Sequence, residues 1–206
     1  IHRDVEGDED LPSVWGLDVS RFGNDKTALC KRQGSIVTEI RSWSGLDLMQ
    51  TVGRVVAEYE SLLPSKRPRE ILVDSIGLGS GVVDRLRELE LPVRGINVAE
   101  DPSMGATYLN LRSELWFKTK GWFEDRACKL PKDDQLLAEL TGIRYSFTSS
   151  GKMKAESKDE MRKRGLASPD LADALCLTMA SDAATALSGA FSSWRGEIKR
   201  NLRGIA

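Results

Sequence analysis

Residues 14–43 read VWGLDVSRFGNDKTALCKRQGSIVTEIRSW, and their pattern predicts the first half of a sheet. The three runs rich in apolar residues cover 14–19, 27–32 and 35–43. Between them stand the turn sequences Phe22-Gly23-Asn24-Asp25 and Gln33-Gly34. Apolar runs joined by short polar turns are typical of paired neighbouring strands. The stretch therefore predicts an antiparallel meander of three strands.

Beyond residue 43, strand-like and helix-like segments alternate. Helical spacing of apolar residues marks 46–63, 82–89, 110–126, 133–140 and 171–186. Short strands are expected at 71–74 and 92–98, then a hairpin at 143–155 and a basic helical turn at 158–164. Strand–helix–strand order implies parallel pairing through crossovers. The expected fold class is α/β: a mixed sheet, in which the antiparallel three-strand meander is continued by parallel strands, with helices on both faces.

The composition restricts the chemistry. Lys and Arg number 30 against 31 Asp and Glu, so the net charge of −1 makes no global case for a nucleic-acid partner. The single histidine, His2, argues against hydrolases and metal sites built on histidine. Three distant cysteines, Cys30, Cys128 and Cys176, are expected to be reduced, buried thiols of an intracellular protein. No apolar run approaches the roughly 18 residues of a membrane span. Chemistry must therefore come from carboxylates, lysines or a hard metal ion.

Three acids interrupt or end apolar elements. Asp18 interrupts the first strand, Asp74 ends the strand at 71–74, and Asp173 lies within the apolar run Leu171-Ala172-Asp173-Ala174-Leu175. An unpaired carboxylate in such surroundings is costly, so each needs a donor, a countercharge or a metal. Strand-end acids gather at one edge of an open sheet. Carboxylates without histidine or cysteine predict a Mg²⁺ or Mn²⁺ site, and two ions there could catalyse phosphodiester hydrolysis.

Two further acids are secondary candidates. Asp170 follows Ser168-Pro169 in the first helical turn, where an acid also favours the helix dipole. Asp25 is most simply a turn residue, with an outer role at the site left open. The glycine-rich segment after Asp74, residues 77–81, is expected to be a backbone turn that lets the next helix pack closely.

Basic residues gather just before the third acid. Residues 152–164 hold six Lys and Arg against Glu156, Asp159 and Glu160, a local charge of +3. They are either a solvated face or a phosphate-gripping edge that positions a duplex without reading bases. The candidate DNA-binding residues are Lys152, Lys154, Lys158, Arg162, Arg164, Arg21 and Arg112. For Arg112, pairing with an acid is an equal alternative.

Four segments together resemble the nuclease domain of the large terminase subunit of tailed double-stranded DNA bacteriophages. They are residues 16–28, 73–81, 108–116 and 168–175, in the family's order, and the resemblance spans roughly residues 13–185. It implies a ribonuclease H-like fold and a metal-dependent endonuclease that cuts concatemeric viral DNA during genome packaging, with little sequence specificity. It also implies that Asp18, Asp74 and Asp173 are the catalytic, metal-binding acids, for two Mg²⁺ or Mn²⁺ ions.

The resemblance also implies partners and a division of the chain. The implied partners are double-stranded DNA, an upstream ATPase domain of the same polypeptide, the portal and the small terminase subunit. The protein would act in the host cell cytoplasm and would be neither secreted nor bound to a membrane. No Gly-x-x-x-x-Gly-Lys-[Ser/Thr] motif occurs, so the ATPase motor is not within these residues. The expected division is an acidic linker at 1–12, the nuclease domain at 13–187 and a basic, flexible tail at 188–206.

Three other interpretations stay open. A restriction-type nuclease would use Glu156-Ser157-Lys158, but the Pro169-Asp170 pair follows this segment instead of preceding it. The second is one half of a sugar-kinase-like or actin-like ATPase, because residues 18–27 resemble the first phosphate hairpin of that fold. That fold normally needs two such halves and a longer chain. A non-catalytic module that docks a packaging motor onto DNA or the portal would need no metal.

Overall fold

The computed structural model describes residues 11–20 and 25–181, in which a five-stranded sheet has the order β3-β2-β1-β4-β5. Its strands are β1 (Ser13–Asp18), β2 (Thr27–Gln33), β3 (Ile36–Trp43), β4 (Glu70–Asp74) and β5 (Val93–Ile96). β1 pairs antiparallel with β2, and β2 with β3, whereas β4 pairs parallel with both β1 and β5. The predicted meander continued by parallel strands is confirmed.

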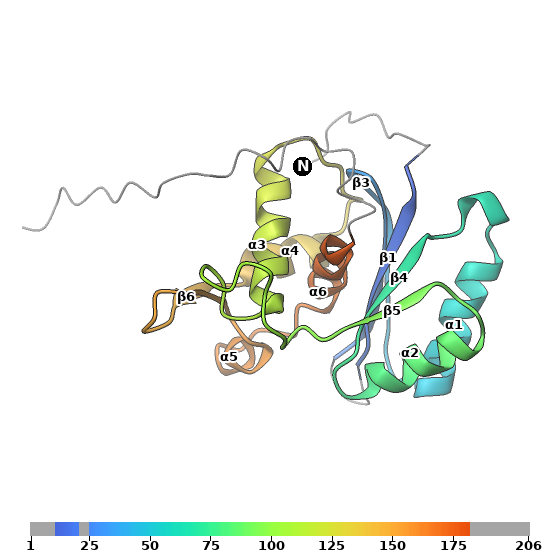
Figure 1. The fold of residues 1–206 in the computed structure, drawn as a ribbon, viewed down its shortest axis with the longest axis horizontal. Helices are drawn as coiled ribbons and strands as arrows, with labels where there is room; N and C mark the ends of the chain where they lie inside the picture. Colours follow the sequence, from blue (N-terminus) through green and yellow to red (C-terminus); the bar gives the residue numbers. More distant parts are fainter. Residues whose placement is uncertain (1–10, 21–24, 182–206) are drawn as a thin grey trace, which may run out of the picture.

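Helices cover both faces of this sheet, as predicted (Figure 1). One face carries α1 (Leu48–Glu60) and α2 (Leu78–Glu88), and the other carries α3 (Leu111–Glu124), α4 (Asp134–Gly142) and α6 (Asp170–Leu177). Trp15 and Leu17 of β1 pack in the core beneath α1 and α2. Because side chains alternate along a strand, Gly16 and Asp18 face the other side, toward α6.

Gly16 brings α6 into close contact with β1. A Cβ atom at this position would lie 2.0 Å from the Ala174 carbonyl oxygen, so only glycine permits this approach. Gly79 at the start of α2 is similarly placed, 1.7 Å from the Asp74 carbonyl oxygen. The turn after Asp74 therefore packs closely against β4, as the glycine-rich sequence predicts. These two glycines set the backbone positions around Asp18 and Asp74.

A small hairpin and a short helix lie beside the main sheet. The hairpin consists of β6 (Tyr145–Phe147) and β7 (Met153–Ala155), and α5 (Lys158–Lys163) follows it directly. Both elements lie near the positions that the sequence predicts. Ser157 caps α5 through a capping box with Glu160, which explains why the helix begins there.

The last predicted helix, 171–186, is wrong beyond Leu177, and its final residues, 182–186, lie outside the described part of the chain. The α-helix ends at Leu177 and is followed by a short 3₁₀ turn, η2 (Thr178–Ala180). Arg32 explains this end, since its guanidinium donates to the Thr178 carbonyl at 2.8 Å and to the Thr178 hydroxyl at 2.8 Å. This tertiary contact satisfies a helix-end group that sequence periodicity cannot show.

Other expectations concern the thiols and the chain ends. Cys30, Cys128 and Cys176 are buried and unbridged, as predicted. Nowhere in residues 11–20 and 25–181 is there a helix long and apolar enough to cross a membrane. The predicted tail at 188–206, most of the predicted acidic linker and Arg21 lie outside the described residues.

Candidate active site

Asp18 and Asp74 end adjacent parallel strands at the same edge of the sheet. Leu17 pairs with Val73, so the acids that follow these two residues are neighbours. Asp18 is buried, with 4% of its surface exposed. Asp74 is partly buried, and its Oδ1 accepts a hydrogen bond from the Ile76 backbone N–H at 3.1 Å. The parallel pairing of β1 and β4 thus brings together two acids that are 56 positions apart in the sequence.

Asp173 reaches this edge from α6, which packs across β1 and β2. Its Oδ1 accepts from the Trp116 indole Nε1 at 2.8 Å and from Arg112 Nη2 at 3.0 Å. Asp173 is buried, like the other residues of α6. Its electrostatic influence is felt at both Asp18 and Asp74. The structure therefore brings the three predicted acids together.

Glu139 of α4 holds the start of α6 in place. The helix begins after Pro169, which supplies no side-chain cap, and the Glu139 carboxylate instead accepts from the Ala172 backbone N–H at 2.9 Å. Glu139 is not among the site residues that the sequence predicts. Its signal was an acid on the apolar face of a helix, between Leu136 and Leu140. Glu139 is a cap supplied by another element, and it fixes the helix turn that carries Asp173.

Lys158 is the shared countercharge of the acids. Its Nζ lies 2.8 Å from Asp18 Oδ2, 3.4 Å from Asp170 Oδ1 and 3.5 Å from Asp173 Oδ2. Asp170 is buried and also accepts from the Lys26 backbone N–H at 2.7 Å, which ties the start of β2 to α6. Of the predicted DNA-binding residues, Lys158 therefore points at the carboxylates.

Burial and charge both perturb these groups. Burial raises the pKa of Asp18 to about 7, against the opposing effect of Lys158 and with the help of Asp173 and Asp170. Burial also raises the pKa of Asp74 above its usual value. Burial disfavours the charged ammonium of Lys158, but the surrounding carboxylates overcome this and raise its pKa. A cation is thus strongly favoured at the point that these carboxylates share.

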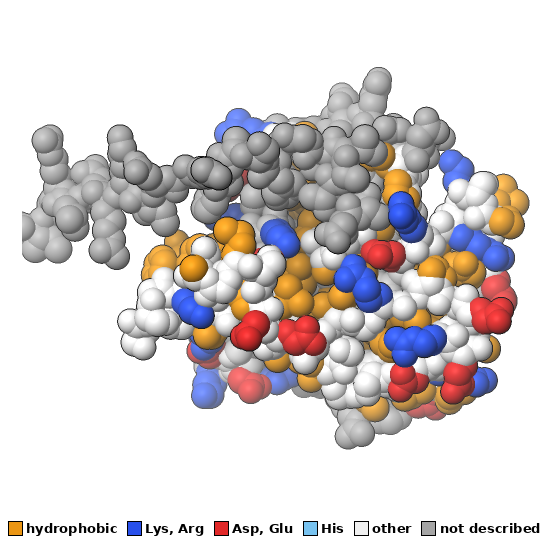
Figure 2. All heavy atoms as spheres, in the orientation of Figure 1, with side chains coloured by type: hydrophobic (Ala, Val, Ile, Leu, Met, Phe, Trp, Pro, Cys, Tyr) orange, Lys and Arg blue, Asp and Glu red, His pale blue; other side chains and the backbone are white. Residues whose placement is uncertain are grey.

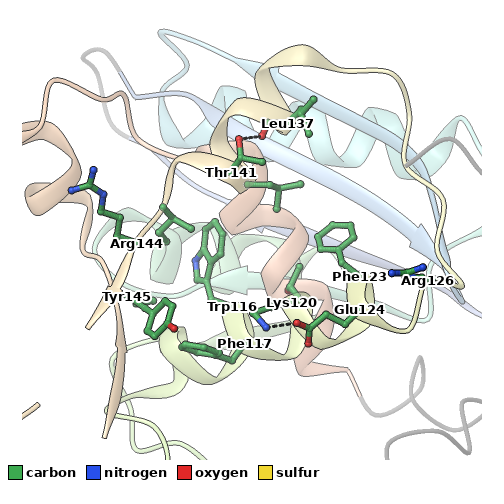
Figure 3. Close-up of a pocket in the computed structure, with 14 residues that line it drawn as sticks. Trp116, Phe117, Lys120, Phe123, Glu124, Arg126, Leu137, Thr141, Arg144 and Tyr145 are labelled. Atoms are coloured by element: carbon green, nitrogen blue, oxygen red, sulfur yellow. Dashed lines mark hydrogen bonds and ion pairs between the residues drawn. The ribbon is translucent and has the colours of Figure 1, made fainter. Parts of the chain in front are cut away.

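The acids line a cavity of about 350 Å³. Its other lining residues include Arg112, Trp116, Lys154, Ser157 and Lys158. A larger, apolar cavity of about 600 Å³ lies between α3, α4 and the hairpin, and none of the three acids lines it. Phe117 and Phe123 of α3 face it together with Leu137 of α4 and Tyr145 of β6 (Figure 3). Trp116 lines both cavities and forms a wall that they share.

The described residues fit a hard cation by their chemistry, although they surround an ammonium group. No three or more His, Cys, Asp or Glu side chains in the described part of the chain are arranged as the ligands of a metal ion. The Lys158 ammonium lies between the Asp18 and Asp173 carboxylates. The donor set is oxygen only and carries excess negative charge, which suits Mg²⁺ or Mn²⁺.

Solved structures supply the comparison, since neither a family model nor a curated protein matches the sequence. The nuclease domain of the large terminase subunit gp2 of bacterial virus Sf6 superposes with a TM-score of 0.71 at 22% identity, over 82% of this chain and 88% of that one. The chain has the fold of large terminase nuclease domains. The large terminase nuclease from thermophilic phage G20c with bound magnesium superposes with a TM-score of 0.63 at 18% identity, over 86% of this chain and 82% of that one. The large terminase nuclease domain of Thermus phage P74-26 superposes with a TM-score of 0.61 at 15% identity, over 84% of this chain and 80% of that one.

The likeness confirms the terminase nuclease fold that the four sequence segments imply. Within that fold, the other predicted basic residues are mostly engaged in ion pairs. Arg112 binds Asp173, and the remaining pairs are Lys154–Glu160 at 2.7 Å, Arg162–Asp25 at 2.5 Å, Arg162–Asp159 at 2.9 Å and Arg164–Glu156 at 2.6 Å. Asp25 thus contacts a basic residue of α5, and no contact with the three acids is present among the described residues.

Lys152 differs from its neighbours on the hairpin. Within the described residues its side chain makes no ion pair, and its backbone N–H donates to the Thr148 hydroxyl at 3.0 Å. Basic and acidic side chains also alternate over the face shown in Figure 2. Lys152 is thus the candidate basic residue that makes no ion pair in the described part of the chain.

Proposed function

We propose that this chain is a metal-dependent endonuclease that cuts concatemeric double-stranded viral DNA during genome packaging, with little sequence specificity. The observation that carries the proposal is the convergence of Asp18, Asp74 and Asp173 on one cavity. The terminase nuclease fold supports it. Solved structures with this fold are named as the nuclease domain or nuclease of a large terminase subunit, in forms with manganese, magnesium or cobalt.

Asp18, Asp74 and Asp173 would hold Mg²⁺ or Mn²⁺, and we propose two ions. Bound there, the ions would supply an activated water and charge stabilisation at the leaving oxygen. The remaining requirements fall to the protein. The strand ends fix Asp18 and Asp74, Glu139 fixes the first turn of α6, and Lys158 keeps the carboxylates together while they lack a metal.

DNA would lie across the hairpin and α5, which border the cavity. Lys152 is the first candidate for a phosphate contact, because no described ion pair competes for its charge. Lys154, Arg162 and Arg164 would have to exchange an acidic partner for a phosphate. Such contacts position the backbone without reading bases, which agrees with cutting of low specificity. Arg21 remains a candidate from the sequence.

The remaining parts of the proposal concern the assembly. An upstream ATPase domain of the same polypeptide would hold the DNA, and the portal and the small terminase subunit would be further partners in the host cell cytoplasm. A non-catalytic docking module is the alternative. One observation favours this alternative: Lys158 gives Asp18 and Asp173 a shared positive charge that does not come from a metal.

A plasmid-nicking assay separates these functions. The proposal predicts nicks in supercoiled DNA with Mg²⁺ or Mn²⁺, none with EDTA, and none from Asp18→Asn, Asp74→Asn or Asp173→Asn. Asp84→Asn is the matched control, because Asp84 is an exposed acid on α2 in a surface pair with Arg87. Circular dichroism would verify that each variant is folded. DNA binding without nicking in either metal would overturn the nuclease and leave the docking module.

A further inference from the structure

The two oxygens of the Asp173 carboxylate have different surroundings. Oδ1 accepts from Trp116 Nε1 at 2.8 Å and from Arg112 Nη2 at 3.0 Å. Oδ2 accepts only a longer hydrogen bond from the same Arg112 nitrogen, at 3.3 Å, and lies 3.5 Å from Lys158 Nζ. Oδ1 therefore makes the shorter contacts with the protein. Oδ2 is the oxygen that faces the Lys158 ammonium, which Asp173 shares with Asp18.

The two donors are themselves held rigidly. Arg112 and Trp116 stand four positions apart on α3, so their side chains project from the same face of the helix. Arg112 Nη1 donates to the Glu156 carbonyl at 2.6 Å, and its guanidinium lies 5.7 Å from the centre of the Trp116 ring. Trp116 is only 7% exposed. Trp116 also belongs to the buried apolar cluster that contains Leu171 and Leu175 of α6, so its ring is held against that helix.

We propose that Arg112 and Trp116 are positioning residues that reserve Oδ1, so that Asp173 offers only Oδ2 to a metal ion. The inference rests on the proposed function, since it concerns how the same site binds its cation. A carboxylate with one oxygen held by two donors cannot rotate to present both oxygens to one ion. Groups that hydrogen-bond to a metal ligand fix its orientation in this way and tune the affinity of the site.

Trp116 offers a clean perturbation. Trp116→Phe removes the indole N–H but keeps an aromatic ring in the wall between the two cavities, and it changes no charge. Trp122→Phe is the matched control, because Trp122 is equally buried on the same helix, about 9 Å further along its axis. No contact between Trp122 and Asp173 is present among the described residues.

The test is titration of the full chain with MnCl₂ in a calorimeter. The unmodified protein and Trp122→Phe should bind Mn²⁺ alike, and Trp116→Phe should bind it about 10-fold more weakly. A crystal structure of the unmodified protein with Mn²⁺ is the second measurement, which does not depend on how a variant folds. It should show Asp173 bound through Oδ2 alone, with Oδ1 still on Trp116 and Arg112.

Each result decides a separate point. Equal affinity in the unmodified protein and a folded Trp116→Phe variant would overturn the positioning role and leave the nuclease proposal standing. Coordination of one Mn²⁺ by both Asp173 oxygens would do the same. If the unmodified protein bound no Mn²⁺ at all, the proposed function would fall, and this inference with it.

Discussion

Replacing Lys158 by methionine should destabilise the metal-free protein. The ammonium is within 3.5 Å of the carboxylates of Asp18, Asp170 and Asp173, and the variant would leave these buried acids facing one another. Removing one partner of a buried ion pair lowers the free energy of unfolding by about 3–5 kcal/mol. The lysine side chain is 32% exposed, so we expect a loss of about 3 kcal/mol here. For a domain of this size, that lowers the melting temperature by about 6–12 °C.

Binding of a metal ion and a lower pH should each restore part of the lost stability. Mn²⁺ can replace the missing positive charge, and a ligand at 100 times its Kd stabilises a protein by about 2.7 kcal/mol. The ion should therefore raise the melting temperature of Lys158→Met more than that of the unmodified protein. Acid should also help, because burial raises the pKa of Asp18 to about 7 even beside Lys158, the variant lacks the lysine that lowers this pKa, and a protonated Asp18 no longer repels its neighbours. The deficit should thus be smaller at pH 6 than at pH 8.

Scanning calorimetry at both pH values, with EDTA or with Mn²⁺, measures these effects. Lys120→Met is the matched control, since Lys120 forms an exposed pair with Glu124, and surface pairs of this kind contribute less than about 1 kcal/mol. A Lys158→Met variant that melts at the temperature of the unmodified protein at pH 8 in EDTA would refute the reasoning. So would a deficit that Mn²⁺ leaves unchanged.

Three further predictions address other parts of the site. Because the folded-state pKa of Asp18 is raised from its usual 3.8 to about 7, stability in EDTA should fall as pH rises through that window, and Asp18→Asn should remove this slope in a plot of melting temperature against pH. Glu139→Ala should lower stability by about 1 kcal/mol in urea unfolding and should slow plasmid nicking; unchanged values would disprove its capping role. Lys152→Glu should weaken binding to all DNA sequences alike and reduce the salt slope by about 1 in fluorescence anisotropy, whereas a loss confined to one sequence would contradict a phosphate contact.

Much of the fold can be predicted from local sequence patterns. The apolar runs and turns in residues 14–43 correctly predict β1, β2 and β3, because strand periodicity and turn chemistry are encoded by adjacent residues. The same reasoning finds Asp18 and Asp74, since an acid at the edge of an apolar strand is visible in the sequence. It fails at the end of the last helix, where Arg32 from a distant strand binds Thr178.

The sequence by itself therefore determined the mixed sheet, its helical layers and the three acids that break apolar elements. Only the tertiary structure decided their partners: Lys158 opposite Asp18, 140 positions away, Trp116 on Asp173 and Glu139 on the start of α6. The reason is physical. Periodicity records which face of an element is buried, but a hydrogen bond between two elements depends on how their backbones pack, and no single stretch of sequence contains that information.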